Sequence, residues 1–167
     1  MKRIAVFIIV LTCLVGAADF GYAGTATANL TVSAAVAGAC LITTTPVSFG
    51  TVVVAPAFST AQGSVSVTCT AGQAWTVTLN RGGAPAGSGR AMIVGGITMV
   101  GYELYHDAGL TQIWGDSGFA GTYFAGSGAA GVGSGAAQTI TVFGRASALS
   151  TAPAGNYLDI VSATVNF

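Results

Sequence analysis

The stretch TATANLTVSAAV (residues 25–36) alternates between apolar and polar side chains. Threonine, asparagine and serine hold most of the odd-numbered positions. The apolar positions are Ala26, Ala28, Leu30, Val32, Ala34 and Val36. Because successive side chains of a strand point to opposite faces, this pattern predicts a long β-strand with one buried, apolar face. The three small residues that follow, 37–39, are expected to form a flexible connection to Cys40.

Residues 1–23 have the three-part layout of a secretory signal peptide. Lys2 and Arg3 precede an apolar run, and small residues at Gly21 and Ala23 suit cleavage before Gly24. The apolar run is short for a membrane span, and no later run approaches that length. We therefore expect an exported mature chain, residues 24–167, that does not insert into a membrane.

The mature chain carries very little charge. The sequence is 52% hydrophobic and 6% charged, with a mean hydropathy of +0.72. Two of the five basic residues and one of the five acidic ones lie in residues 1–23, which leaves three arginines and four acids. Such a composition can fill a hydrophobic core, and a net charge near zero favours association. It argues against nucleic-acid binding, which needs clustered Lys and Arg.

Strands are predicted throughout the rest of the chain, because β-branched and aromatic residues recur in short runs between turn residues. The predicted strands are 40–50, 63–70, 75–80, a weaker one at 90–99 broken by two glycines, 100–107, 139–146 and 157–167. The glycine-rich segment between residues 115 and 138 is expected to be a long surface loop. This spacing predicts a single all-β domain, a sandwich or a barrel.

Two cysteines, Cys40 and Cys69, remain after export. In an oxidising compartment an isolated pair is expected to form a disulfide. A metal site would need further ligands, and His106 is the only histidine. We therefore predict no metal site and no cofactor.

The side chains that catalysis needs are almost absent from the mature chain. It has no lysine, and His106 beside Asp107 is the nearest approach to half of a catalytic triad. Adjacent residues of a strand point to opposite faces, so an exposed histidine at a strand end is the better interpretation. No catalytic residue is predicted, and the chain is not expected to be an enzyme.

Three further features invite a functional interpretation and have a simpler one. Gly126, Gly128 and Gly131 match a dinucleotide-binding spacing, but no strand–helix context surrounds them, so chance explains the match. Residues 114–116 could form a sugar-binding lip, although a turn with a buried tryptophan is the preferred interpretation. Tyr157 could bond its hydroxyl to the backbone, as a tyrosine corner does.

The last predicted strand has an apolar face and no successor to cover it. This face consists of Val161, Ala163, Val165 and Phe167. Soluble proteins avoid a long, unpaired apolar edge, and an immunoglobulin-like sandwich would continue with one more strand. The sequence therefore predicts an incomplete immunoglobulin-like β-sandwich that lacks its final strand.

Taken in order, these features resemble the spore coat U domain family, which includes subunits of the archaic, Csu-type chaperone-usher pili. The matching positions are Cys40, 48–50, 63–69, 90–92, 102–107, 114–116, Phe143, Gly144, Gly155, Tyr157, Asp159 and Phe167. The glycine-rich segment 115–137 departs from the pattern.

The resemblance implies donor-strand complementation, in which the N-terminal segment of one subunit supplies the missing strand of the next. Residues 24–39 would then hold the donor strand, with Ala26, Ala28, Leu30, Val32, Ala34 and Val36 inserted, and residues 40–167 the pilin-like sandwich. The acceptor groove would include Val47, Phe49, Val161, Ala163, Val165 and Phe167. The implied partners are copies of the chain or related subunits, a periplasmic chaperone and an outer-membrane usher. The implied role is a surface fibre that supports adhesion and biofilm formation.

Two other functions stay open on the sequence. One is a secreted spore-coat or matrix protein that assembles without an usher. The other is a secreted carbohydrate-binding module that uses Trp114 and the glycine-rich loop.

Overall fold

The structure is a computed structural model that describes residues 24–83, 85–86, 89–117 and 126–167. The predicted signal peptide, residues 1–23, and residues 118–125 of the expected glycine-rich loop lie outside the described residues. The chain divides into two units, Met1–Ala35 and Val36–Phe167. Each is described by itself.

Residues 24–35 form no strand, and every one of them is exposed. Leu30 and Val32 are 88% and 86% exposed. The expected strand with a buried face is therefore not formed within the single chain. A strand needs a partner for its backbone N–H and C=O groups, and none of the residues that the structure describes pairs with this segment.

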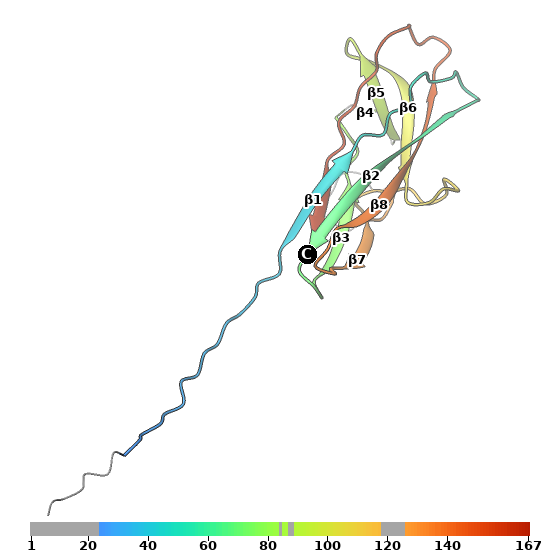
Figure 1. Cartoon of the computed structure of the whole chain (residues 1–167). Coiled ribbons are helices and arrows are strands. Elements are labelled where there is room, and N and C mark those ends of the chain that lie inside the picture. Colours follow the sequence, from blue (N-terminus) through green and yellow to red (C-terminus); the bar gives the residue numbers. More distant parts are fainter. Residues whose placement is uncertain (1–23, 84, 87–88, 118–125) are drawn as a thin grey trace, which may run out of the picture. The chain divides into compact units, whose positions relative to one another are not determined.

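The second unit consists of two antiparallel sheets (Figure 1). The larger sheet has the order β1 (Cys40–Thr45), β2 (Ser59–Cys69), β8 (Gln138–Ala148), β6 (Ile97–Tyr105), β5 (Gly89–Val94) and β4 (Pro85–Ala86). The smaller sheet has the order β7 (Ala129–Val132), β3 (Ala74–Leu79) and β9 (Ala163–Asn166). The prediction of an all-β domain is confirmed.

One hydrophobic core lies between the two sheets. Val65 and Val67 of β2 pack in the same buried cluster as Val77 and Leu79 of β3. Along β2 the buried positions alternate, as expected for a strand with one face on a core. The arrangement is a sandwich rather than a barrel.

Several of the predicted strands have different limits in the structure. β1 ends at Thr45 rather than at residue 50, because Pro46 follows and has no N–H to donate to a ladder. The break expected within residues 90–99 is a two-residue hairpin turn between β5 and β6. Gly95 and Gly96 both have positive φ angles there, 56° and 83°, as a type I′ turn requires.

The last predicted strand, 157–167, is shortened to β9, which begins at Ala163. Upstream of β9 the chain leaves the smaller sheet, because β3 ends at Leu79. Leu158 instead exchanges two backbone hydrogen bonds with Ile93 of β5, each 3.2 Å long. Residues 158–163 thus cross from one sheet to the other.

The expectation that the glycine-rich segment is only a loop is wrong for its second half. Residues 129–132 form β7, which pairs with β3. A Cβ on Gly131 would collide with the ring of Trp75, and one on Gly128 would lie 2.7 Å from the Val77 carbonyl oxygen. These glycines, like Gly126 against Ile113, allow close packing, which explains the apparent dinucleotide motif.

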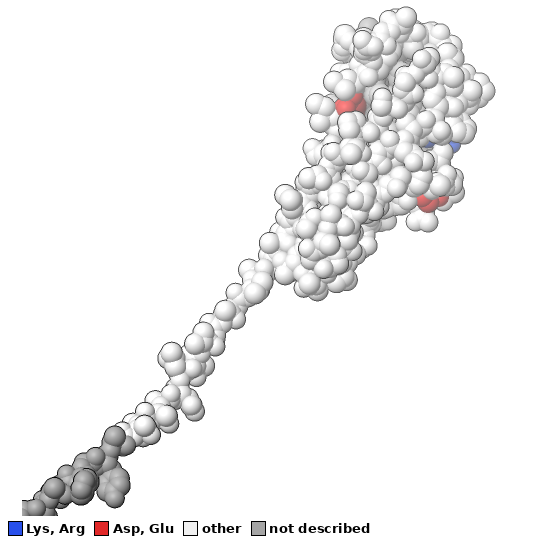
Figure 2. Space-filling model, in the orientation of Figure 1, with Lys and Arg blue, Asp and Glu red and all other residues white. Residues whose placement is uncertain are grey.

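The surface is almost free of charge. Most of the face drawn in Figure 2 shows neither basic nor acidic side chains. In the part of the chain that the structure describes, no helix is long and apolar enough to cross a membrane.

Candidate functional site

A groove of about 570 Å³ opens between the segment that leaves β1 and the segment that leads into β9. Its floor includes Val65, Leu79, Leu104 and Val142, which are core residues from four different strands. The hydrophobic core is therefore not closed on this side of the sandwich.

Four of the six predicted acceptor residues line this groove: Val47, Phe49, Val161 and Ala163. The other two lie elsewhere. Val165 packs against the core as part of β9, and Phe167 is 61% exposed.

The first wall of the groove follows β1. A Cβ on Gly144 would lie 2.7 Å from both Phe49 Cζ and Val47 Cγ1, and one on Gly63 would lie 2.8 Å from Val47 Cγ2. The two glycines thus let Val47 and Phe49 pack directly on the backbones of β2 and β8. The ring centroid of Phe49 lies 6.3 Å from that of Tyr102.

The second wall precedes β9 and is anchored by Asp159. The Tyr102 hydroxyl donates a hydrogen bond of 2.6 Å to this carboxylate. The backbone N–H groups of Gly83 and Ile160 donate to it over 2.8 Å each. Burial first, and the hydrogen bond to Asp159 second, raise the pKa of Tyr102 well above its usual value. The carboxylate therefore ties this wall to the larger sheet.

Sequence reasoning did not assign Tyr157 and Asp159 to the groove, although both line it. Both have odd numbers, as Val161 and Ala163 do, so they continue the same face of the predicted strand toward the N-terminus. The alternation of side chains in the sequence could therefore have identified them as groove residues. The hydroxyl of Tyr157 donates to the carbonyl of Pro153 over 2.8 Å, which confirms the expected bond to the backbone.

The strands on either side of the groove each have one open edge. Within the described residues, β1 pairs only with β2, and β9 pairs only with β3. The two strands belong to different sheets and approach each other there (Figure 1). An extended segment in the groove would find ladder partners on one or both sides.

A family model for the Spore Coat Protein U domain matches residues 26–164. The chain belongs to this family. No curated protein matches the chain. Among solved structures, the fold is similar to one from Acinetobacter baumannii, with a TM-score of 0.55 and 22% identity. Its title describes the CsuC–CsuE chaperone–tip adhesion subunit pre-assembly complex of archaic chaperone-usher Csu pili. The match covers 79% of this chain but only 40% of that one.

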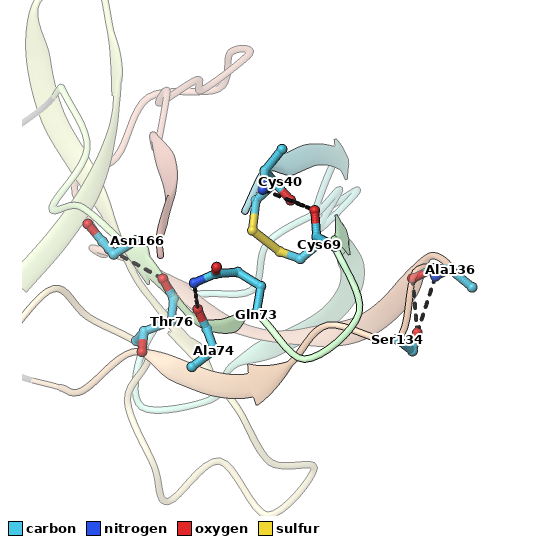
Figure 3. Close-up of a disulfide and its surroundings, with 10 residues drawn as sticks. Cys40, Cys69, Gln73, Ala74, Thr76, Ser134, Ala136 and Asn166 are labelled. Carbon is cyan, nitrogen blue, oxygen red and sulfur yellow. Dashed lines mark hydrogen bonds between the residues drawn. A yellow bond between two sulfur atoms is a disulfide. The ribbon is translucent and has the colours of Figure 1, made fainter. Parts of the chain in front are cut away.

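In this Spore Coat Protein U domain, a disulfide joins the first residue of the edge strand β1 to the last residue of β2. Cys40 and Cys69 are register partners, with Cα atoms 4.1 Å apart (Figure 3). The predicted pairing is confirmed. The disulfide fixes the N-terminal end of β1, which follows residues 24–36 in the chain.

A buried arginine holds the two sheets of the domain together beside the groove. Arg90 on β5 is 1% exposed, and its Nη2 donates to the carbonyl oxygens of Leu79, Asn80 and Trp114 over 2.7–2.9 Å. Its Nη1 lies 3.5 Å from Glu103 Oε2. Carbonyls from the last residue of β3, from the residue after it and from the segment that follows β6 thus converge on one guanidinium.

The residues considered for catalysis have structural contacts instead. His106 is half-buried rather than exposed, with its ring stacked on Trp114 at 4.7 Å and its Nε2 3.0 Å from the Ser127 carbonyl oxygen. Asp107 accepts hydrogen bonds from the backbone N–H groups of Gln112 and Thr111, which lower its pKa. Among the described residues no group of His, Cys, Asp and Glu could hold a metal ion.

The suggested sugar-binding lip is wrong. Trp114 is 0% exposed and donates its indole N–H to the Val77 carbonyl over 2.9 Å, while Asp116 is 5% exposed. Trp114 therefore has no free face on which a sugar could stack, and the turn with a buried tryptophan is the correct interpretation.

Proposed function

We propose that the chain is a non-enzymatic structural subunit of a chaperone-usher pilus, exported through the periplasm and polymerised at the cell surface by donor-strand exchange. One observation carries this proposal. The core is open along a groove, and the same chain has an uncovered segment with alternating apolar residues. Residues 25–36 of one copy would fill the groove of the next.

The hydrophobic gain supports this insertion. Leu30, Val32 and Val36 are each at least 86% exposed. Burying each of them is worth about 1.5–3 kcal/mol before the cost of ordering the segment. Ala26, Ala28 and Ala34 add smaller terms on the same face.

The geometry also favours a fibre over a closed ring or dimer. The donor segment and the acceptor groove are different surfaces, so the contact is heterologous and leaves a free donor and a free groove at the ends. The low surface charge gives little repulsion between neighbouring copies.

The same open core motivates the proposed partners. A subunit with an open core needs a temporary strand before assembly, which a periplasmic chaperone would supply and an outer-membrane usher would exchange. The similar solved structure is titled as a chaperone–subunit pre-assembly complex, which supports this order of events. The resulting fibre would serve adhesion and biofilm formation.

The test is to express variants in the native host and to examine the surface material by electron microscopy. Leu30→Asp and Val32→Asp would place an unpaired charge in the groove, and we expect both to abolish fibres. The subunit should still fold on its chaperone, because the chaperone supplies its own strand in place of this segment. Thr31→Asp and Ser33→Asp are the matched controls. They place the same charge on the opposite face and should leave fibres intact.

Deletion of residues 25–36 should act like the apolar-face substitutions. Normal fibres from the deletion variant would refute donor-strand exchange through this segment. Equal harm from both faces would refute the proposed insertion. A coat or matrix protein that assembles without an usher would still form material when the usher is removed.

A further inference from the structure

We propose that Thr70 and Gln73 position the donor segment by holding its root, Gly38 and Ala39, on the domain. The hinge between successive subunits is then confined to Ala37. This inference rests on the proposed function, because it concerns how donor and domain are joined within a fibre. It also replaces the expected flexible connection over residues 37–39.

Ala39 is bonded to the turn between β2 and β3. Its N–H donates to Thr70 Oγ1 over 3.1 Å, and its carbonyl accepts from the Thr70 N–H over 2.9 Å. The next residue, Cys40, is joined to Cys69 by the disulfide. Ala39 and Cys40 are thus held by Thr70 and Cys69, the first residue of the turn and the last residue of β2.

Gly38, one residue before Ala39, packs closely against Gln73 of the same turn. A Cβ there would collide with the side-chain amide of Gln73, so glycine is needed for space rather than for its φ angle. The Gln73 side chain is itself fixed, because its Nε2 donates to the Ala74 carbonyl over 3.0 Å (Figure 3).

The turn that holds the root is firmly supported. Gly72 N–H donates to the Gly133 carbonyl over 2.8 Å, and Gly133 N–H donates to the Gln73 carbonyl over 2.7 Å. Gly135 N–H donates to the Cys69 carbonyl over 3.1 Å. The segment that follows β7 therefore braces the turn.

Little chain remains between the two fixed ends. Val36 is the last apolar residue of the donor pattern and would be held in the neighbour's groove, while Gly38 packs against Gln73 of its own domain. Ala37 alone would connect them, and one residue contributes only two soft dihedral angles. Successive subunits would then be restricted in their relative orientation, and the fibre would be stiff.

The experiment compares the fibres of a Thr70→Val, Gln73→Ala double variant with those of the unaltered chain by electron microscopy. The two substitutions remove the Thr70 hydroxyl and the Gln73 amide that contact residues 38 and 39, and leave only the bond from the Thr70 N–H to the Ala39 carbonyl. With the attachment weakened in this way, we expect the persistence length to fall by about two-fold or more. Thr141→Val is the control, because it removes an exposed hydroxyl on β8 that is far in sequence from the root. Hydrogen exchange should also show a slow Ala39 amide in the unaltered chain and a fast one in the double variant.

Normal fibres of unchanged stiffness from the double variant would overturn this inference and leave the proposed function standing. Fast exchange of the Ala39 amide in the unaltered chain would overturn it as well, including when the double variant makes no fibres. Failure of the proposed function has a different signature. In that case the unaltered chain makes no fibres, or deleting residues 25–36 changes nothing.

Discussion

β8 and the segment 25–36 have the same sequence pattern and opposite surroundings. In β8 the even-numbered residues Val142, Ala146 and Ala148 are buried, and Thr139 and Thr141 on the other face are exposed. β8 pairs with β2 on one side and β6 on the other. Residues 25–36 alternate as regularly, yet both faces are exposed and no strand is formed.

The difference shows what alternation can and cannot report. It indicates that a strand will have two unlike faces, because side chains alternate across the pleat. It does not say which chain supplies the neighbouring strands or the core. For β8 the partners are in the same domain, while for residues 25–36 we propose that they belong to another copy.

The largest expected effect comes from placing the same charge in each region. Val142→Asp puts an unpaired carboxylate in the core, where Val142 is 4% exposed. It should destabilise the domain by at least about 4 kcal/mol, enough to prevent folding in many domains of this size. Leu30→Asp should change subunit stability by less than about 0.5 kcal/mol, because that side chain is exposed in the single chain.

Chemical unfolding of the mature chain, followed by fluorescence of the buried Trp75 and Trp114, measures both effects. Thr141→Asp, beside Val142 but on the exposed face of β8, is the control. A large loss of subunit stability from Leu30→Asp would mean that residues 25–36 complete their own domain. The two regions would then not differ in the way described.

The second prediction concerns the disulfide at the border between the unpaired segment and the first paired strand. Replacing Cys40 and Cys69 together by serine opens a covalent loop with a sequence separation of 29 residues. Loop-closure entropy predicts a loss of about 3.5 kcal/mol in the free energy of unfolding. Urea unfolding of the double variant against the unaltered chain provides the measurement. A loss below about 1 kcal/mol would show that β1 is held mainly by its ladder.

Much of this architecture could be predicted from the sequence, because the signals are local. The alternation in β2 and β8, the pair of cysteines and the apolar odd-numbered face near the C-terminus all follow from neighbouring residues. Four of the predicted acceptor residues line the groove for this reason.

The remaining features depend on contacts that are distant in sequence. Nothing near Gly131 shows that Trp75 packs against it, so its segment was expected to be a loop. Likewise, Asp159 and Tyr102 are 57 residues apart, and only the folded sandwich brings the carboxylate to the hydroxyl. The buried position of Arg90 arises in the same way.

The smallest expected effect tests how the open side of the sandwich is held. Tyr102→Phe removes the hydroxyl that donates to Asp159. The carboxylate still accepts hydrogen bonds from the N–H groups of Gly83 and Ile160. Near neutral pH the loss should be about 1.5 kcal/mol, the range for a hydrogen bond to a charged acceptor.

Because the pKa of Tyr102 is raised on folding, its contribution is fully present below the unfolded pKa of about 10 and is lost as pH rises above it. The unaltered chain should therefore lose stability between about pH 9 and pH 11 more steeply than the Tyr102→Phe variant. Burial also raises the pKa of Tyr105, but this contribution is the same in both chains. Urea unfolding across this range measures the difference, with Leu30→Asp as a common background to keep the chains monomeric. Parallel pH profiles for the two chains would show that the Tyr102 hydroxyl does not hold the wall of the groove through Asp159.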